Sequence, residues 1–396
     1  MISGTNSFLG FPRLMEENIR NIPLKLCPQF LPANKLSVLN LLNHPFPPII
    51  RSFNSSDLSS FLSPLPPTTI TVTEIQVIPV PPISIVEQLA SDPALTSAKS
   101  IICIHAPGSS DMRIPPWVIT YWLETIRIKP IKQKWVVAEE KLQSLKQRRD
   151  RTDETLALIK RVYDMLGCLS WNEDISGFST KIPIHYLSTY LTTEWLSDLH
   201  ESQLLDLLQQ EIHQKGKGGL EVDVGDVFFI SKLQDVYNIP SDYASSPRYA
   251  WLRKKGQEIG DRRFNMFTVI SNIKQNHWVG IVVNFESSHI YYGDSLGLVI
   301  DDRLESALTW WIYYHTGRNF TVSNLPITHQ HDTHSCGILA WNAIMVHLFP
   351  KAYQLLDPRS VDYERLKIFL RIADRHNDKV RTSSHFSMWR GSPYFG

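Results

Sequence analysis

The chain has 396 residues, with 40 lysines and arginines against 39 aspartates and glutamates, which gives a formal net charge of +1. This near-neutral balance provides no electrostatic argument for binding to nucleic acid or to a membrane surface. The cysteines, at positions 27, 103, 168 and 336, include no C-x-x-C pair. Because they form neither a disulfide framework nor a zinc ribbon, we expect an intracellular protein, in the nucleus or the cytoplasm.

Neither a secretory signal nor a membrane segment is expected. The N-terminal stretch MISGTNSFLGFPRLMEENIR lacks a long apolar core and contains Glu16, Glu17 and Arg20. The strongest apolar run elsewhere, residues 75–86, is short and is interrupted by Pro79.

Proline usage divides the chain, because fourteen of the 25 prolines lie in the first 100 residues. We predict a Pro-rich, loop-rich or partly disordered N-terminal region over residues 1–110. Residues 111–180 form a helical segment that we expect Pro130 to break. The domain that carries the chemistry follows over residues 181–376, and residues 377–396 form a C-terminal tail.

The helical segment contains a basic stretch, residues 127–161, with eleven lysines and arginines against five acidic residues. Such a patch could contact nucleic acid. No aromatic interleaving or groove-reading motif accompanies it, so we favour a solvated face of a helical pair.

From residue 181 the hydrophobic periodicity alternates between helical and strand-like runs. Helices are expected over 195–212, 248–259, 304–314, 336–348 and 362–375, and strands over 222–230, 266–273, 278–285 and 290–292. A few strands in hairpins, flanked by helices, indicate an α+β fold.

The last two central strands bring together a histidine and a carboxylate. If the hairpin turns near residues 285 and 286, the numbers of two residues that face each other across the two strands add up to about 571. The numbers 277 and 294 also add up to 571. Facing side chains of an antiparallel pair have Cβ atoms roughly 5 Å apart, so we expect His277 to contact Asp294. A carboxylate fixes the tautomer of an imidazole and stabilises its protonated form.

Cys336 is the candidate nucleophile, because it begins a strongly helical run (CGILAWNAI). Unpaired N–H groups and the helix dipole at this end favour a thiolate. Gln330, six residues earlier, has an amide that can donate to a developing oxyanion alongside the Cys336 N–H. Spacing alone does not show that Cys336 reaches His277.

Four motifs in one order resemble the Ulp/SENP family of ubiquitin-like-protein peptidases. They are W-L-x-D at 195–198, H-W at 277–278, D-S-L at 294–296 and Q-x5-C-G at 330–337. The resemblance covers about 190 residues, and any one of the four motifs alone would be weak.

The resemblance implies a papain-like cysteine peptidase core of the Ulp/SENP type, with no metal or organic cofactor. His277, Asp294 and Cys336 would form the triad, with Gln330 at the oxyanion hole. The partners implied are a ubiquitin-like modifier, SUMO-like, and its conjugates, bound by a monomer. Trp195 and Trp278 match the family's tryptophans that sandwich the Gly-Gly tail of the modifier. Asp198 receives no catalytic role.

One departure concerns the residue before the nucleophile, where the family usually has Asp and this chain has Ser335. Two alternatives of other classes stay open: a catalytically weak or dead module that binds a ubiquitin-like protein, and a Cys-His-Asp acyltransferase. A third alternative is a zinc site formed by the histidine, aspartate and cysteine side chains between residues 329 and 336. We favour it less, because these candidate ligands lie on one short segment and their alternating spacing directs them apart. Those residues are His329, His331, Asp332, His334 and Cys336.

Overall fold

The computed structural model describes residues 25–50, 58, 61–103, 112–215, 221–261, 263–274 and 276–390. The N-terminal stretch that we examined for a secretory signal lies outside these residues. Two compact units emerge: residues 1–137 with 166–173, and residues 138–165 with 174–396. We call them the N-terminal unit and the site unit. The predicted domain limits at 110, 180 and 376 remain predictions.

The N-terminal unit has short helices packed around an apolar core, although we predicted its first part to be loop-rich. Its helices are α2 (Cys27–Phe30), α3 (Val38–Asn43), α4 (Val72–Val77), α5 (Ile83–Ser91) and η2 (Pro93–Thr96). A small antiparallel sheet contains β1 (Leu62–Ser63), β2 (Ser100–Ile102) and β3 (Arg113–Ile114). Side-chain caps begin α3 and α4, where Ser37 and Thr71 each accept a backbone N–H three residues on.

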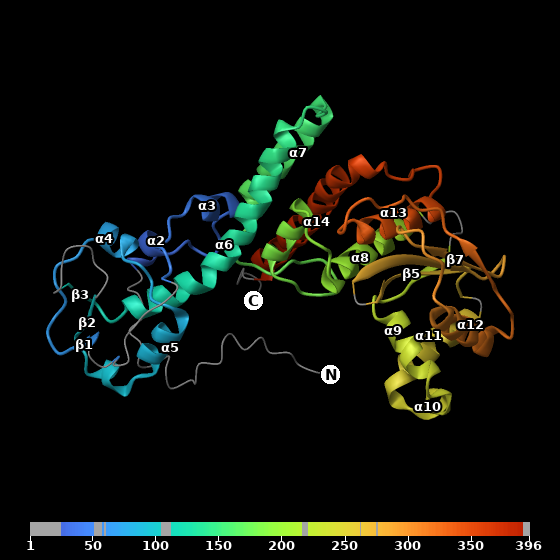
Figure 1. Cartoon of the computed structure of the whole chain (residues 1–396), viewed down its shortest axis with the longest axis horizontal. Helices are drawn as coiled ribbons and strands as arrows, with labels where there is room; N and C mark the ends of the chain where they lie inside the picture. Colours follow the sequence, from blue (N-terminus) through green and yellow to red (C-terminus); the bar gives the residue numbers. More distant parts are fainter. Residues whose placement is uncertain are drawn as a thin grey trace, which may run out of the picture. The chain divides into compact units, whose positions relative to one another are not determined.

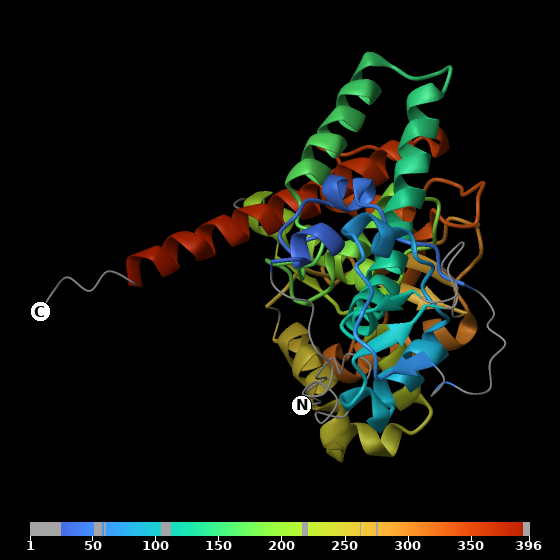
Figure 2. The same ribbon diagram turned by 90° about the vertical axis from the view of Figure 1, so that its left-hand side faces the viewer.

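Helix α6 (Val118–Gln147) runs through Pro130, so the prediction that this proline breaks the helix is wrong. Proline removes one intrahelical hydrogen bond at a cost of about 3 kcal/mol. Burial on both sides of the proline offsets that cost, because Ile128 and Trp135 are 2% and 1% exposed. Helix α7 (Asp153–Cys168) follows and runs beside α6 (Figure 2).

The site unit is built on a five-stranded sheet in the order β4-β5-β6-β7-β8. Its strands are β4 (Val222–Val224), β5 (Met266–Ile273), β6 (His277–Asn284), β7 (His289–Gly293) and β8 (Thr321–Asn324). The central pairs are antiparallel and the two edge pairs are parallel. Together with the helices around it, this sheet confirms the predicted α+β class.

Helices cover both faces of the sheet (Figure 1). On one face α9 (Phe229–Tyr237), α11 (Ala250–Gly260) and α12 (Asp302–Thr316) pack on it through the main apolar cluster. On the other lie α8 (Asp198–Lys215) and α13 (Cys336–Leu348), and α13 contacts α14 (Val361–Arg390). Short helical turns complete the unit: η3 (Ile184–Leu191), α10 (Pro240–Ser245), η4 (Pro247–Tyr249) and η5 (Pro358–Ser360).

Most predicted elements of this unit are present, and α13 has the predicted bounds. The strand expected over 222–230 is wrong beyond Val224. Gly225 and Asp226 end it, and the Asp226 carboxylate accepts the Phe228 N–H at 2.8 Å just before α9 begins. Strand β8 was not predicted. Helix α14 is one continuous helix (Figure 2) that extends to Arg390, into the predicted tail.

Two glycines allow α13 to approach its neighbours closely. A Cβ on Gly280 of β6 would lie 3.1 Å from the Ala340 carbonyl of α13, closer than ordinary packing permits. A Cβ on Gly337 would lie 1.8 Å from Glu201 Oε1 on α8. Small residues at both points therefore fix the start of α13 against the sheet and against α8.

No helix in the described part of the chain combines the length and the apolar character needed to span a membrane.

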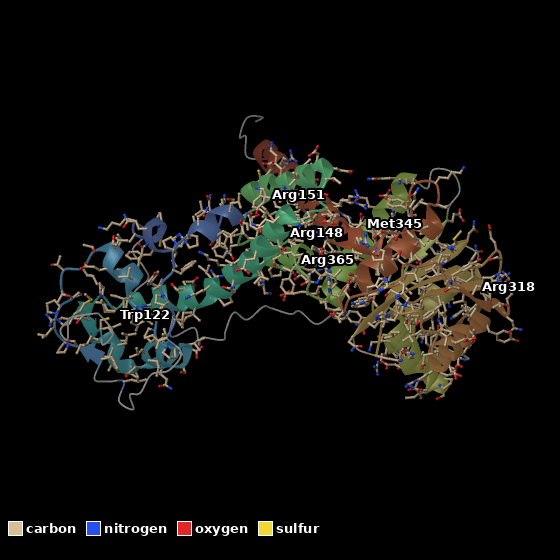
Figure 3. All side chains as sticks on the ribbon, turned by 45° about the horizontal axis from the view of Figure 1, so that its top comes forward. Trp122, Arg148, Arg151, Arg318, Met345 and Arg365 are labelled. Atoms are coloured by element: carbon tan, nitrogen blue, oxygen red, sulfur yellow. The ribbon has the colours of Figure 1, made fainter. Side chains whose placement is uncertain are left out.

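The basic stretch of α6 and α7 is partly paired within the site unit. Lys141 Nζ and Arg148 Nη1 lie 3.0 and 3.5 Å from Asp362 Oδ2 on α14, and Arg148 also pairs with Asp150. Figure 3 labels Arg148 and Arg151 near the turn between the two helices. The interpretation of this stretch as a solvated face of a helical pair stays a prediction.

Candidate active site

His277 and Asp294 are in direct contact. His277 Nε2 lies 2.7 Å from Asp294 Oδ1, and both side chains are buried. The predicted contact is therefore present, although the register differs from the expected one. The β6–β7 pairs sum to 573, as in Asn284 with His289. Because the shift is an even number of residues, both side chains stay on one face as diagonal neighbours.

The Asp294 carboxylate is held in place from several sides. Its Oδ1 also accepts the Leu296 N–H at 2.7 Å, and its Oδ2 accepts the Tyr292 hydroxyl at 3.4 Å. Since the acceptor is a carboxylate, His277 Nε2 is the nitrogen that donates. This fixes the tautomer of the ring and leaves Nδ1 free to face another group.

Cys336 is the second group that contacts the His277 ring. It is the first residue of α13, 1% exposed, and it hydrogen-bonds to His277. Burial lowers the pKa of His277, but the hydrogen bonds to Asp294 and Cys336 outweigh it and raise the pKa to about 9. At neutral pH the imidazole is therefore protonated and lies between a carboxylate and the sulfur of Cys336.

Gln330 lies in the segment before α13 and is 6% exposed. Its Oε1 accepts the Ser295 hydroxyl at 2.8 Å, and its Nε2 donates to the Asp332 carbonyl at 2.6 Å. Nε2 also donates to Asp332 Oδ1 at 3.4 Å, so these bonds together set the orientation of the amide. Ser295, part of the D-S-L motif, thus orients the candidate oxyanion donor, a role that the sequence did not reveal.

Ser335, the departure from the family pattern, is buried and hydrogen-bonded to a carboxylate. Its hydroxyl donates to Asp332 Oδ2 at 2.6 Å, and Asp332 Oδ1 accepts the backbone N–H groups of His334 and Ser335, both at 2.8 Å. Burial raises the pKa of Asp332, but these bonds lower it below its usual value. The ionised carboxylate of Asp332 therefore stabilises the turn that directly precedes Cys336.

The two tryptophans are brought together, but they stack directly on each other. The ring centroids of Trp195 and Trp278 are 5.3 Å apart, with 18° between the planes. Trp278 is 1% exposed, and its indole N–H donates to the Leu196 carbonyl at 2.7 Å. Trp195 is only half-buried. A peptide between two rings needs about 7 Å, two contacts of about 3.5 Å, so the slot is closed here.

Sequence reasoning missed two buried ionisable residues beside the site, Glu201 on α8 and Arg365 on α14. Arg365 (labelled in Figure 3) is 1% exposed, and its guanidinium donates to the carbonyls of Thr189 and Glu194 at 2.6 and 2.8 Å. It ties α14 to the segment before Trp195. For Glu201 a signal existed in the sequence, because it lies three, four and seven residues before Leu204, Leu205 and Leu208, on the same face of the helix.

The histidine-rich segment before Cys336 does not assemble into a metal site. No group of three or more His, Cys, Asp or Glu side chains in the described residues is arranged to hold a metal ion. His329 and His331 pack ring to ring at 5.3 Å between centroids, while His334 lies beside Asp332.

Comparison with family models matches residues 194–380 to the Ulp1 protease family, C-terminal catalytic domain. A comparison with curated proteins finds no match.

Several solved structures are similar to this chain at low sequence identity. The C-terminal Ulp1 protease domain in complex with Smt3, the yeast ortholog of SUMO, is 17% identical, with a TM-score of 0.43 over 55% of this chain and 93% of that one. The Ulp1-like SUMO protease catalytic domain of Chaetomium thermophilum is 14% identical, with a TM-score of 0.42 over 57% and 90%. The Xanthomonas campestris effector XopD bound to ubiquitin is 21% identical, with a TM-score of 0.32 over 44% and 91%.

Proposed function

Because residues 194–380 belong to the Ulp1 protease family, we propose that this protein is a thiol peptidase or isopeptidase acting on a ubiquitin-like modifier. It cleaves after the C-terminal Gly-Gly of the modifier, SUMO-like in the first instance, either to process a precursor or to release a conjugate. One observation carries the proposal: His277 bonds on one side to Asp294 and on the other to Cys336.

The first half of the reaction forms a thioester. The Cys336 sulfur attacks the carbonyl carbon of the terminal Gly, and the negative charge moves to the carbonyl oxygen. The Cys336 N–H and the side-chain amide of Gln330 stabilise that oxyanion. As the C–N bond breaks, His277 Nδ1 gives its proton to the leaving amine.

The second half hydrolyses the thioester. Neutral His277 Nδ1 now takes a proton from water, whose oxygen attacks the thioester carbonyl. The carbon–sulfur bond breaks, the modifier leaves with a free carboxylate, and the thiolate and imidazolium are restored. Asp294 keeps the ring in the required tautomer throughout.

The tryptophan pair supplies the selectivity for a narrow tail. The rings need to separate before a Gly-Gly segment passes between them. Trp278 is held by its bond to Leu196, whereas Trp195 is half-buried, so Trp195 is the ring that moves. A side chain larger than hydrogen on either tail residue would collide with the rings, which explains the preference for glycine.

The experiment is a panel of SUMO, NEDD8 and ubiquitin, each with a C-terminal electrophile. We expect the wild-type chain to be labelled on Cys336 by one of them, SUMO first. Folded protein that none of the three labels would contradict the proposal. Modifier binding without labelling would indicate a binding module, and faster transfer to added amines than to water would indicate an acyltransferase.

A further inference from the structure

Glu201 is the most unusual ionisable group near the site. It lies in the first turns of α8 with 0% exposure, and neither carboxyl oxygen has a hydrogen-bond partner among the described residues. Glu211, near the other end of the same helix, is also buried, yet Lys215 and Tyr353 donate to it at 2.7 and 2.8 Å. Burial of a carboxyl without donors strongly disfavours its charged form.

The carboxyl of Glu201 lies against the first turn of α13. A Cβ at Gly337 would come within 1.8 Å of Glu201 Oε1 and 2.8 Å of Cδ, so the carboxyl fills the space that the missing side chain leaves. Gly337 directly follows Cys336. A charge on Glu201 would therefore be felt by the sulfur through a protein interior that screens poorly.

Three groups on other elements face Glu201, and none of them donates a hydrogen bond to it. Cys336 faces it from α13, Tyr190 from η3 and Arg365 from α14. The Tyr190 hydroxyl donates to the His200 carbonyl at 3.0 Å. The Arg365 guanidinium donates to backbone carbonyls and forms no ion pair with Glu201 within the described structure.

These surroundings hold a proton on the acid. Burial raises the pKa of Glu201 well above its usual value, the charge of Cys336 raises it further, and Arg365 lowers it only in part. The Cys336 coupling has a reciprocal consequence. A thiolate favours the protonated acid, and an ionised Glu201 disfavours the thiolate.

We propose that Glu201 is a positioning residue for the nucleophile: a neutral carboxylic acid, packed on Gly337, whose ionisation opposes formation of the Cys336 thiolate. This deepens the proposed function and rests on it only in treating Cys336 as the nucleophile. Protonated, the acid supports the first turn of α13 without adding charge. Once ionised, it reduces the reactivity of the thiol.

The first test is thermal unfolding of the full chain as a function of pH, comparing wild type with Glu201→Gln, which keeps the shape and cannot ionise. Folded Glu201 holds its proton while the unfolded chain loses it above about pH 4.3, so the wild type loses stability as pH rises from there toward the raised native value. We expect the Tm of Glu201→Gln to gain on that of wild type by about 3 °C per pH unit in this window.

Glu211→Gln is the matched control on the same helix. Burial raises the pKa of Glu211, but its bonds to Lys215 and Tyr353 outweigh this and lower it. Removing that charge should therefore reduce Tm above about pH 4.3, the opposite direction. Parallel curves for wild type and Glu201→Gln would overturn the proposal.

The second test measures the rate at which chloroacetamide alkylates Cys336, followed by peptide mass spectrometry across pH. Below the pH at which Glu201 ionises, wild type and Glu201→Gln should react equally. Above it, and over the pH range in which the thiol is still mostly protonated, Glu201→Gln should react about tenfold faster, since a neighbouring like charge shifts a titration by about one pH unit or more. Identical profiles would refute the coupling. This readout does not depend on a modifier, so it is separable from failure of the proposed function.

If Glu201→Gln does not fold, infrared spectroscopy of wild-type protein replaces it. A protonated buried acid gives a carbonyl band that disappears on ionisation. Alkylating Cys336 removes the thiolate charge, so we expect the band to disappear at a lower pH in alkylated protein. A band that titrates at the same pH before and after alkylation, or no such band, would overturn the proposal.

Discussion

The two compact units bury different kinds of side chain. In the described part of the N-terminal unit, the buried polar residues are three hydroxyls, Ser63, Ser100 and Thr125. The site unit also buries histidine, acidic and arginine side chains: His200, Glu201, Glu211, His277, Asp294, Arg365 and His376. Burying an ionisable group opposes folding unless it is paired, and such groups concentrate at functional sites. The contrast agrees with the proposed placement of the catalytic residues in the site unit.

The largest effect on activity is expected when the sulfur of Cys336 is removed by mutation. Cys336→Ala should lower kcat by roughly 10⁵-fold or more, because no other group can form the thioester. Cys103, buried in the N-terminal unit, is the control: Cys103→Ala should cost stability but leave the kcat of the folded enzyme unchanged. Turnover of a modifier precursor measures both. A Cys336→Ala protein within tenfold of wild type would rule out Cys336 as the nucleophile.

The next effect comes from the buried carboxylate. Asp294→Asn should reduce kcat by roughly 10²–10⁴-fold, because the amide cannot hold the same tautomer or stabilise the imidazolium. Asp294 helps to raise the pKa of His277 to about 9. Without it the ring loses its proton at lower pH, so the alkaline limb of the kcat profile should move to lower pH. An unmoved limb in a folded variant would contradict this assignment.

The raised pKa of His277 also affects the stability of the folded protein. His277 binds its proton more tightly in the folded state than in the unfolded chain, so its contribution to stability is complete below about pH 6.5 and is lost as pH rises through about 9. Asp294→Asn should therefore destabilise the protein more at pH 6 than at pH 10, measured by chemical denaturation. An equal loss at both pH values would show that the pair carries no linked proton.

A smaller effect is expected at the oxyanion donor. Gln330→Ala should reduce kcat by about 10²-fold with little change in KM, since its N–H acts on charge that develops only in the transition state. Gln209→Ala, at a partly exposed position of α8, should have no effect on either constant. If the loss appeared in KM alone, Gln330 would be a binding residue.

The smallest effect should come from the moving ring. Trp195→Ala should raise KM about tenfold, because the tail loses one of the two rings that contact it. Trp251→Ala, a partly exposed tryptophan on α11, controls for loss of an indole. An unchanged KM would remove the slot from the proposal.

Local patterns predicted much of this fold, and long-range contacts did not follow from them. Helix α13 and the β6–β7 hairpin came from periodicity, and the hairpin brought His277 to Asp294 even with its turn misplaced by one residue. The Cys336–His277 contact joins residues 59 positions apart on different elements, and only the family pattern suggested it. Strand β8 is short and mostly exposed, so periodicity gave no signal, and Pro130 was overridden by burial of the surrounding helix.

Glu201 shows a different limit. From the sequence alone, a glutamate on the apolar face of a helix cannot be told from a solvated residue at the edge of that face. Its meaning depends on what faces it, and the facing residue, Gly337, lies 136 positions later. Buried acids of this kind are visible only once the elements are packed.

The stacked tryptophans set the conformational equilibrium of the free enzyme. Under the proposed function, the rings, whose centroids lie 5.3 Å apart, have to separate before a tail binds, and the apparent dissociation constant rises by the inverse of the population of the separated form. A ligand that merely binds the outer surface would leave this balance unchanged. A Gly-Gly tail, which fits only between parted rings, would shift it, so the slot acts as a threshold that non-cognate peptides do not cross.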